Sequence, residues 1–308
     1  MNRCPLTYAP CKEDYSPEGL KRFSRRLSGL HPLPFSGEEL RLQAAARAEK
    51  MSIQGVQPKV SARLNIQLQK FDIVDNCGHY ILKPQLADYQ EVPENEDLTM
   101  KMAEAAGIDT PLHGLIYGRD RELCYCIRRF DRSGRNKKHH VEDFAQLGEH
   151  TRETKYRSSM EKVATIIETY CTFPAVDKLK LFRLTLFSFL VGNEDMHLKN
   201  FSIIRTEDII RLSPAYDLLN TTIVLPSTTE ELALPLHGKK SNLNRKDLID
   251  YYALDRLQLS RRVVKKVMEQ FEQVRNQWEK LLAESFLSDR MKQKFLDILN
   301  NRYTRIYN

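Results

Sequence analysis

Apolar and polar residues alternate strictly in VSARLNIQL, residues 60–68, where every second side chain is apolar. This period of two predicts a half-buried strand. The turn-forming residues Asp75–Gly78 follow, and HYILKP, residues 79–84, predicts another strand. Two more strands are predicted at HGLIYG, residues 113–118, and ELCYCIRRF, residues 122–130, joined by a polar tip.

Helical patterns interrupt and precede these strands. Ser36 and Glu39 have the spacing of a capping box before an Ala-rich stretch, which predicts a helix reaching about Met51. In PENEDLTMKMAEAAG, residues 93–107, acids fill the first turn and a glycine ends the apolar spacing, which predicts a second helix. Residues 52–130 should therefore be mostly sheet with one inserted helix.

The pattern changes after about residue 141. Met160, Val163, Ile167 and Tyr170 have the spacing of one helix face, and residues 175–191 are apolar on nearly all sides, as expected of a buried helix. FSIIR and IIRL around the turn TED predict a hairpin over 201–212. Residues 240–308 combine helical periodicity with many basic residues, which are most simply the exposed faces of packed helices.

We therefore predict an α/β fold, of the α+β kind, in two lobes. A chain of 308 residues is long enough for two lobes of ordinary size. The β-rich lobe should occupy residues 1–130 and the helical lobe residues 131–308. The interrupted apolar runs are too short to cross a membrane.

Composition adds little to this picture. The net charge of +7 suits an acidic partner such as a nucleotide, a nucleic acid or an acidic protein, although a solvated basic surface explains it equally well. Six cysteines without a C-x-x-C pair predict free thiols in a reducing compartment. Cys4 and Cys11 could instead bind metal or form a disulfide, but no second ligand pair follows at zinc-like spacing.

Chemistry concentrates in GNEDMHLKNFSII, residues 192–204, between a buried helix and a strand. Asp195 and Asn200 are five residues apart, and the predicted hairpin carries Asp217 back toward them. An Asp that orients a hydroxyl, with an Asn and an Asp that bind Mg²⁺, suits phosphoryl transfer, where catalysis is mainly positioning and charge neutralisation. One D-x-x-x-x-N match alone is weak, since it occurs by chance in many proteins.

The preceding lobe strengthens this interpretation. A turn around Gly55 precedes a regular strand, Lys83 ends a later strand, and Glu96 lies in the first turn of the next helix. Kinases use this order to cover the phosphates, contact them with Lys and orient the Lys with Glu. Taken singly, Lys83 would be a surface lysine, Glu96 an acid favoured by the helix dipole, and Gly55 a turn glycine, because the G-x-G-x-x-G loop is missing.

The chain resembles the HipA-type serine/threonine kinase toxins of bacteria. The resemblance is carried, in order, by CPLTYAPC, KMSIQGVQPKVSA, YILKP, ENE, RRFDR, VEDFAQ, GNEDMHLKNFS and LSPAYDLLN. It implies a two-lobed protein-kinase-like fold that uses ATP and Mg²⁺. Asp195 would be the catalytic carboxylate, and Asn200 and Asp217 would bind Mg²⁺. The implied ATP-binding residues are Gln54, Gly55, Val56, Gln57, Pro58, Lys59, Lys83, Glu96, Arg128, Arg129, Phe130, His197 and Tyr216.

The resemblance also implies regulation and partners. Ser52 matches a serine that family members autophosphorylate, although a serine at a helix end explains it as well. Because the sequence starts almost at CPLTYAPC, it is similar to the shorter HipT variant, whose missing subdomain is a separate small protein. The implied partners are that protein, a helix-turn-helix antitoxin that alone contacts DNA, and an aminoacyl-tRNA synthetase as substrate, in a bacterial cytoplasm, with secretion into a host left open.

Two other functions remain open on the sequence. A small-molecule kinase is possible, because antibiotic phosphotransferases share the Asp, Asn and Asp plan, and it would need a closed acidic pocket beside Asp195. The second alternative is an ATP-binding module that acts through an antitoxin without turnover, although such a module has no need of Asp195. The hinge carries Arg128 where longer relatives commonly have Glu, which leaves nucleotide affinity open.

Overall fold

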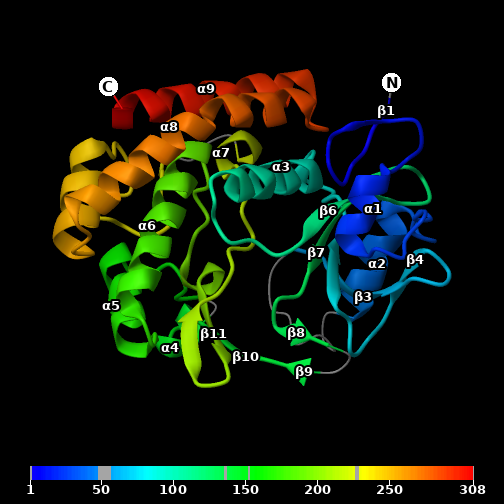
Figure 1. Ribbon diagram of the computed structural model, residues 1–308, viewed down its shortest axis with the longest axis horizontal. Helices are drawn as coiled ribbons and strands as arrows, with labels where there is room; N and C mark the ends of the chain where they lie inside the picture. The colour runs from blue at the N-terminus through cyan, green and yellow to red at the C-terminus, as the bar shows by residue number, and fades with distance from the viewer. Residues whose placement is uncertain (1, 48–56, 135–136, 152, 226–228, 308) are drawn as a thin grey trace. The chain divides into compact units, whose positions relative to one another are not determined.

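The computed structural model describes residues 2–47, 57–134, 137–151, 153–225 and 229–307. It is a mixed α/β structure, which confirms the predicted fold class (Figure 1). The chain divides into two compact units, and each is described by itself; the domains predicted at 1–130 and 131–308 stay a prediction. The first unit contains Met1–Leu98, Pro111–Arg132 and Leu281–Leu287, and the second contains Thr99–Thr110, Ser133–Lys280 and Ser288–Asn308.

Five antiparallel strands form the main sheet of the first unit, in the spatial order β4-β3-β5-β7-β6. Ala62 in β3 pairs with Ile73 on one side and Tyr80 on the other, and Lys83 in β5 pairs with Tyr125 in β7. All four sheet segments predicted from the alternation are present. The strands are β3 Val60–Asn65, β4 Lys70–Ile73, β5 Tyr80–Lys83, β6 His113–Tyr117 and β7 Leu123–Arg128.

The strand predicted over residues 60–68 is too long. β3 ends at Asn65, and the Asn65 side-chain oxygen accepts a hydrogen bond from the Leu68 N–H at 3.1 Å. Such side-chain bonds favour turns over continued strand, and Gln69 completes the turn with a φ of 49°. Leu68, expected on the buried face, is therefore 56% exposed, and the chain returns as β4, which the alternation did not predict.

Helices and a small hairpin pack with this sheet. α1, Pro17–Phe23, and α2, Gly37–Arg47, contribute Leu20 and Leu40 to the same core as the strand residue Val60. The predicted capping box is confirmed, because the Ser36 N–H donates to Glu39 at 2.9 Å and the Glu39 N–H donates to the Ser36 hydroxyl at 3.2 Å. The expected helix end near Met51 lies outside the described residues. The hairpin strands are β1 Asn2–Arg3 and β2 Pro10–Cys11.

α3, Val92–Ala105, forms where the pattern of residues 93–107 predicted a helix. Its apolar residues Leu98 and Met102 are fully buried. Gly107 follows in the left-handed region with a φ of 73°, a conformation that suits glycine at the end of a helix. The chain passes from the first unit to the second within this helix, after Leu98.

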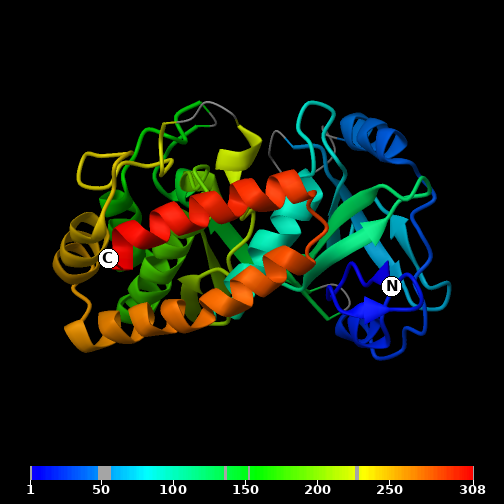
Figure 2. The same ribbon diagram turned by 90° about the horizontal axis from the view of Figure 1, so that it is seen from above.

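The second unit is mainly helical and centres on α6, Pro174–Val191. Apart from Arg183, every residue from Leu181 to Val191 is buried, as the apolar run predicted. α6 packs against α5 and α9 (Figures 1 and 2). The other helices are α4 Phe144–Leu147, α5 Met160–Tyr170, α7 Thr221–Val224, the π-helix η2 Lys246–Arg256, α8 Arg261–Glu284 and α9 Asp289–Tyr307.

The predicted hairpin is confirmed as β11, Ser202–Thr206, and β12, Ile209–Leu212. A third strand, β10, His140–Asp143, pairs with β11 in a segment where a helical pattern was expected. The helix begins only at Phe144, because Asp143 caps it and accepts a hydrogen bond from the Gln146 N–H at 2.8 Å. A further short pair joins β8, Arg132–Ser133, with β9, Lys137–Lys138.

The exposed fractions of the side chains correct the buried face predicted for α5. Met160, Val163 and Ile167 are buried in α5, but Tyr170 in the last turn is 41% exposed, because the core no longer covers that end of the helix. All six cysteines are free, which leaves no disulfide between Cys4 and Cys11. Across the described ranges, no helix is long and apolar enough to cross a membrane.

Candidate active site

The loop after α6 carries Asp195, the predicted catalytic residue. α6 ends at Gly192 with a φ of 76°, and a Cβ there would lie 2.7 Å from the Asn220 side-chain oxygen, so the turn needs glycine. The following residues run without regular structure to the 3₁₀ turn η1, Leu198–Asn200. The Asn200 side-chain amide donates to the Asp195 carbonyl at 2.8 Å, as does the His197 N–H. The loop thus fixes the backbone of Asp195 from within.

The carboxylate of Asp195 faces outward and is 42% exposed. Its Oδ1 accepts a hydrogen bond from the hydroxyl of Tyr156 at 2.6 Å, and His197 Nε2 lies 3.9 Å from the same oxygen. Burial raises the pKa of Tyr156, and the hydrogen bond to Asp195 raises it further. Tyr156 is therefore a protonated donor at neutral pH.

His197 is buried beside this carboxylate, with only 5% of its surface exposed. Burial lowers the pKa of His197, while the Asp195 charge opposes that shift and the Lys155 charge adds to it. Lys155 Nζ lies 2.7 Å from Nε2, and an ammonium group can only donate, so Nε2 accepts and Nδ1 carries the ring proton. His197 Nδ1 has no hydrogen-bond partner among the described residues. This neutral tautomer leaves an N–H donor beside the loop.

Asn200 and Asp217, the predicted magnesium ligands, both lie in the second unit. Asn200 is 8% exposed, and its amide nitrogen is used on Asp195, which leaves the side-chain oxygen as an acceptor. Asp217 has a left-handed φ of 59°, and its charge acts on the pKa of both His197 and Tyr216, so its carboxylate lies close to the loop. The β11–β12 hairpin returns the chain to this place, as its pattern predicted.

These oxygen donors fit Mg²⁺ only in part. Carboxylate and amide oxygens are the ligands that Mg²⁺ prefers, and it usually takes few protein ligands together with phosphate oxygens and water. Within the described ranges, no three His, Cys, Asp or Glu side chains gather in a way that could hold a metal ion. Asn200 and Asp217 would therefore supply two oxygens to an ion whose remaining ligands come from ATP and water.

Tyr216, which follows the β11–β12 hairpin in the chain, binds the loop that carries Asp195. Its hydroxyl donates to the Lys199 carbonyl at 3.0 Å and lies 3.0 Å from the Ser202 hydroxyl. Burial raises the pKa of Tyr216, so the phenol stays protonated. Its expected contact with ATP stays a prediction.

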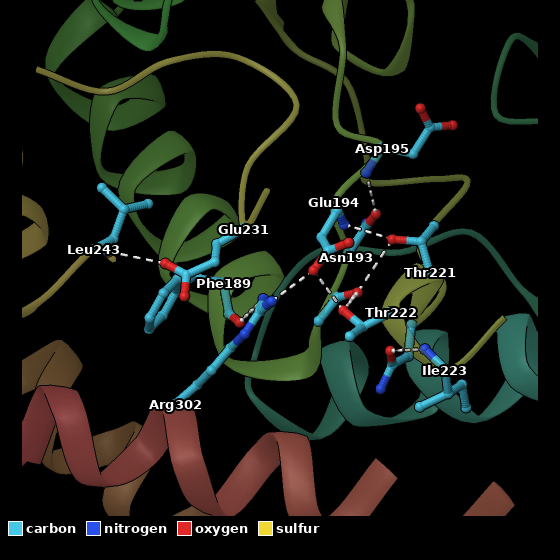
Figure 3. A network of polar contacts seen from close by, with 12 residues as sticks. Phe189, Asn193, Glu194, Asp195, Thr221, Thr222, Ile223, Glu231, Leu243 and Arg302 are labelled. Atoms are coloured by element: carbon cyan, nitrogen blue, oxygen red, sulfur yellow. Dashed lines mark hydrogen bonds and ion pairs between the residues drawn. The ribbon is translucent and has the colours of Figure 1, made fainter. Parts of the chain in front are cut away.

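A buried ion pair anchors the residue before Asp195 to the last helix. Arg302 in α9 donates to the Glu194 carboxylate at 2.7 Å and to the Phe189 carbonyl at 2.8 Å. Glu194 also lies 2.7 Å from the Thr222 hydroxyl, and its N–H donates to the Thr221 hydroxyl at 2.7 Å. In Figure 3 the Asp195 carboxylate points away from this network, which leaves it available for chemistry while its neighbour is fixed.

In the first unit the structure brings Lys83 and Glu96 together. Lys83 Nζ, at the end of β5, lies 2.6 Å from Glu96 Oε1, in the first turns of α3. The two side chains are 6% and 1% exposed. A lysine held this way has a fixed direction, because its flexible stem is ordered by a buried partner.

Burial, together with neighbouring acids, makes one carboxyl of α3, that of Glu94, hard to ionise. Burial raises the pKa of Glu94 to about 7, and the charges of Glu91, Glu122 and Asp97 also raise it. Its Oε2 is buried, and the described residues offer it no hydrogen-bond partner. Because the folded chain keeps a proton that the unfolded chain loses above about pH 4.5, stability should fall as the pH rises toward 7.

Glu94→Gln should remove this dependence. We expect the free energy of unfolding to exceed that of the wild type by about 2 kcal/mol at pH 8 and to equal it near pH 4. Urea titrations at both pH values measure the difference. Glu38→Gln is the matched control, because Glu38 is an exposed acid in the first turn of α2 and should show no such pH dependence. Equal stability of Glu94→Gln and wild type at pH 8 would contradict the prediction.

The predicted hinge follows β7. The Arg128 N–H donates to the Leu112 carbonyl and the Arg129 N–H to the His79 carbonyl, each at 2.8 Å. The Arg129 side chain is held by Asp131 through two hydrogen bonds of 2.9 and 2.8 Å. Since both main-chain N–H groups are used, adenine could meet the main chain of these two residues only through carbonyl oxygens. Phe130 follows directly and is half-buried.

The predicted phosphate loop is described only in its last part. Gln57, Pro58 and Lys59 are half-buried and lead directly into β3. Ser52, Gln54, Gly55 and Val56 lie outside the described residues, so the expectations placed on them stay predictions.

Four residues of this site were missed at the sequence level: Lys155, Tyr156, Glu194 and Arg302. Lys155 and Tyr156 stand in a polar segment without periodicity, and Arg302 has the pattern of any basic helix residue. Only Glu194, beside Asp195 in the quoted motif, had a positional signal. The other three come from segments far from the motif in sequence, which no local pattern could connect.

Comparison with known proteins agrees with this geometry. Residues 51–278 match the family described as HipA-like C-terminal domain. A Haemophilus influenzae protein named "Putative kinase" is 30% identical over 266 residues, which are 78% of this chain and 75% of that protein. The serine/threonine-protein kinase toxin HipA of Shewanella oneidensis is 26% identical over 192 residues, 56% of this chain and 43% of that protein.

A solved structure shows the same fold. It contains HipA of Shewanella oneidensis with HipB and operator DNA, and its match has a TM-score of 0.69 at 20% identity, over 91% of this chain and 73% of that one. The resemblance first drawn from motifs is therefore confirmed by the matched family and by the fold. The chain belongs to the family of HipA-like C-terminal domains, whose relatives are named as kinases.

Proposed function

We propose that this protein is a kinase that transfers the γ-phosphate of ATP to a serine or threonine hydroxyl of a protein. The observation that carries the proposal is the exposed Asp195 carboxylate, whose main chain is bound by the side chain of Asn200 on a loop anchored in the core. Phosphoryl transfer needs such a fixed carboxylate to orient the attacking hydroxyl. The kinase names of the relatives support the reaction class.

Asp195 acts on the acceptor. Its carboxylate receives the hydrogen bond of the acceptor hydroxyl and takes the proton as the new oxygen–phosphorus bond forms. The bond between the γ-phosphorus and the bridging oxygen breaks, and ADP leaves with that electron pair. The Asn200 bond to the Asp195 carbonyl holds the main chain from which this carboxylate extends.

Asn200 and Asp217 are the proposed ligands of Mg²⁺, which neutralises phosphate charge when bound. Lys83, ordered by Glu96, would contact the phosphates, and residues 54–59 would cover them. His197 would direct its Nδ1–H toward the site, and Tyr216 would keep the loop in register with the hairpin. Arg128, Arg129 and Phe130 are the proposed adenine contacts.

The resemblance to HipA-type toxins supports a proposal for the substrate and for regulation. We propose an aminoacyl-tRNA synthetase as the protein substrate and autophosphorylation at Ser52 as an off switch, because two added negative charges would repel the ATP phosphates. The Shewanella structure joins its HipA with HipB and operator DNA, which supports a DNA-binding antitoxin as a partner here. Contact with DNA would be indirect.

The purified chain should phosphorylate itself when given ATP and Mg²⁺. We expect intact-mass spectra to show a gain of ~80 Da for each phosphate added to a hydroxyl, with peptide mapping around Ser52. EDTA should prevent the gain, because Asn200 and Asp217 would then lack their ion. ATP binding without transfer to the chain or to any protein of a bacterial lysate would contradict the proposal and favour a non-catalytic module. Transfer only to small molecules would favour a small-molecule kinase.

A further inference from the structure

We propose that Tyr156 occupies the acceptor position on Asp195 and must leave it before another hydroxyl can be phosphorylated. This inference rests on the proposed kinase function and adds a built-in gate to it. Neither the motifs nor the family match gives Tyr156 a role. The proposal comes from the contact that its hydroxyl makes in the second unit.

The hydroxyl of Tyr156 makes the bond that an acceptor needs. It donates to Asp195 Oδ1 at 2.6 Å, within the range of about 2.6–3.2 Å expected between a general base and the donor atom whose proton it takes. A serine or threonine hydroxyl would have to make the same hydrogen bond to the same carboxylate. Tyr156 and the acceptor therefore compete for one position.

Two contacts of the preceding residue, Lys155, and one contact of the Tyr156 ring hold the tyrosine there. The Lys155 carbonyl accepts from the Leu198 N–H at 3.3 Å, and Lys155 Nζ lies 2.7 Å from His197 Nε2. The Tyr156 ring meets the His197 ring edge to face at 5.0 Å between centroids. Lys155 and Tyr156 are thus attached to the catalytic loop through a main-chain hydrogen bond, a side-chain contact and a ring contact.

The tyrosine can also leave at low cost. Its side chain is 42% exposed, so moving it breaks surface contacts rather than the core. The Asp195 side chain is also 42% exposed, so an acceptor can approach it from the solvent. When a protein substrate binds, its hydroxyl would replace the Tyr156 hydroxyl as the donor to Asp195. Departure of Tyr156 therefore depends on an acceptor whose shape lets it reach this carboxylate.

Tyr156→Phe tests the gate, because it removes only the hydroxyl and keeps the ring on His197. Two acceptors are offered together with Mg·ATP. Transfer to water is measured by the release of ADP, and transfer to dephosphorylated casein is measured by the phosphate it incorporates. We expect both rates to rise about tenfold, since a hydrogen bond to a charged group no longer competes with the acceptor. Tyr170→Phe is the control: Tyr170 is 41% exposed, matching Tyr156, and should leave both rates unchanged.

Nitration gives a readout that needs no turnover. Tetranitromethane attacks phenolate, so Tyr156 should react more slowly than Tyr170 in the wild type. The difference should narrow in Asp195→Ala, where the hydrogen bond is lost and only the burial of Tyr156 remains. Peptide mass mapping measures both sites in one sample. Equal nitration rates of the two tyrosines in the wild type, or a difference that Asp195→Ala leaves unchanged, would overturn the proposal that the Tyr156 hydroxyl is bound to Asp195.

The remaining outcomes separate the gate from the kinase. Unchanged rates in Tyr156→Phe would overturn the proposed gate but not the proposed kinase function. Lower rates would also overturn the gate, because Tyr156 would then assist transfer to the acceptor. If wild type, Tyr156→Phe and Tyr170→Phe all fold but none consumes ATP, the proposed function fails, and the gate fails with it.

Discussion

Replacing Asp195 with alanine should lower the rate of phosphate transfer by about 10²–10⁴-fold, the usual contribution of a positioned acid or base. The variant loses the only group proposed to orient the acceptor hydroxyl and take its proton. The chain should still fold, because the Asp195 side chain is 42% exposed and its main-chain bonds to Asn200 and His197 do not need the carboxylate. Transfer of labelled phosphate from ATP measures the effect.

Asp208→Ala is the control for this change. Asp208 is an exposed carboxylate in the turn between β11 and β12 of the same unit, so its loss should alter neither rate nor melting temperature. More than a tenth of the wild-type rate in Asp195→Ala would argue against a catalytic role. In that case Asp195 would be a loop residue whose hydrogen bond to Tyr156 is structural.

The second large effect is expected in α9, at Arg302. Arg302→Met should reduce the free energy of unfolding by about 3–5 kcal/mol, because it leaves the buried Glu194 carboxylate without its cation. Activity should fall as well, since Glu194 directly precedes Asp195 and its N–H is bound by Thr221. Urea unfolding and phosphate transfer are measured on the same preparation.

Two companion variants make this test specific. Lys294→Met removes an exposed cation from the same helix and should change stability little. Adding Glu194→Gln to Arg302→Met should recover part of the lost stability, because a neutral amide is less costly to bury than a carboxylate that has lost its cation. If Arg302→Met unfolds like Lys294→Met, the ion pair contributes nothing beyond a surface pair.

Both predictions concern one short loop and the elements that support it. Asp195 would do the chemistry, Asn200 and His197 set its backbone, and Arg302 fixes the residue before it. The Asp195 carboxylate is half-exposed, whereas the ion pair between Arg302 and Glu194 is buried. Replacing Asp195 should therefore lower the rate of phosphate transfer with little loss of stability, whereas replacing Arg302 should lower both.

Long periodic segments were predicted well because their pattern repeats over many residues. The all-apolar run of α6, the amphipathic start of α5 and the β11–β12 hairpin formed as expected. Two short elements, β4 and β10, were missed, because four residues are barely enough to show a period. β5 and β12 are equally short but follow recognisable turn residues, and both were predicted. Competing side-chain bonds at Asn65 and Asp143 set where β3 ends and where α4 begins.

The sequence by itself determined the kinds of element, the mixed α/β class and the loop that carries Asp195 and Asn200, because each depends on residues near one another in the chain. Only the tertiary structure decided which distant groups meet that loop. Tyr156 and Asp195 are 39 positions apart, and Arg302 and Glu194 are 108 apart. Such pairs follow from how helices and loops pack around α6, and hydrophobic burial, which drives that packing, is non-directional and leaves no local pattern that pairs one residue with another.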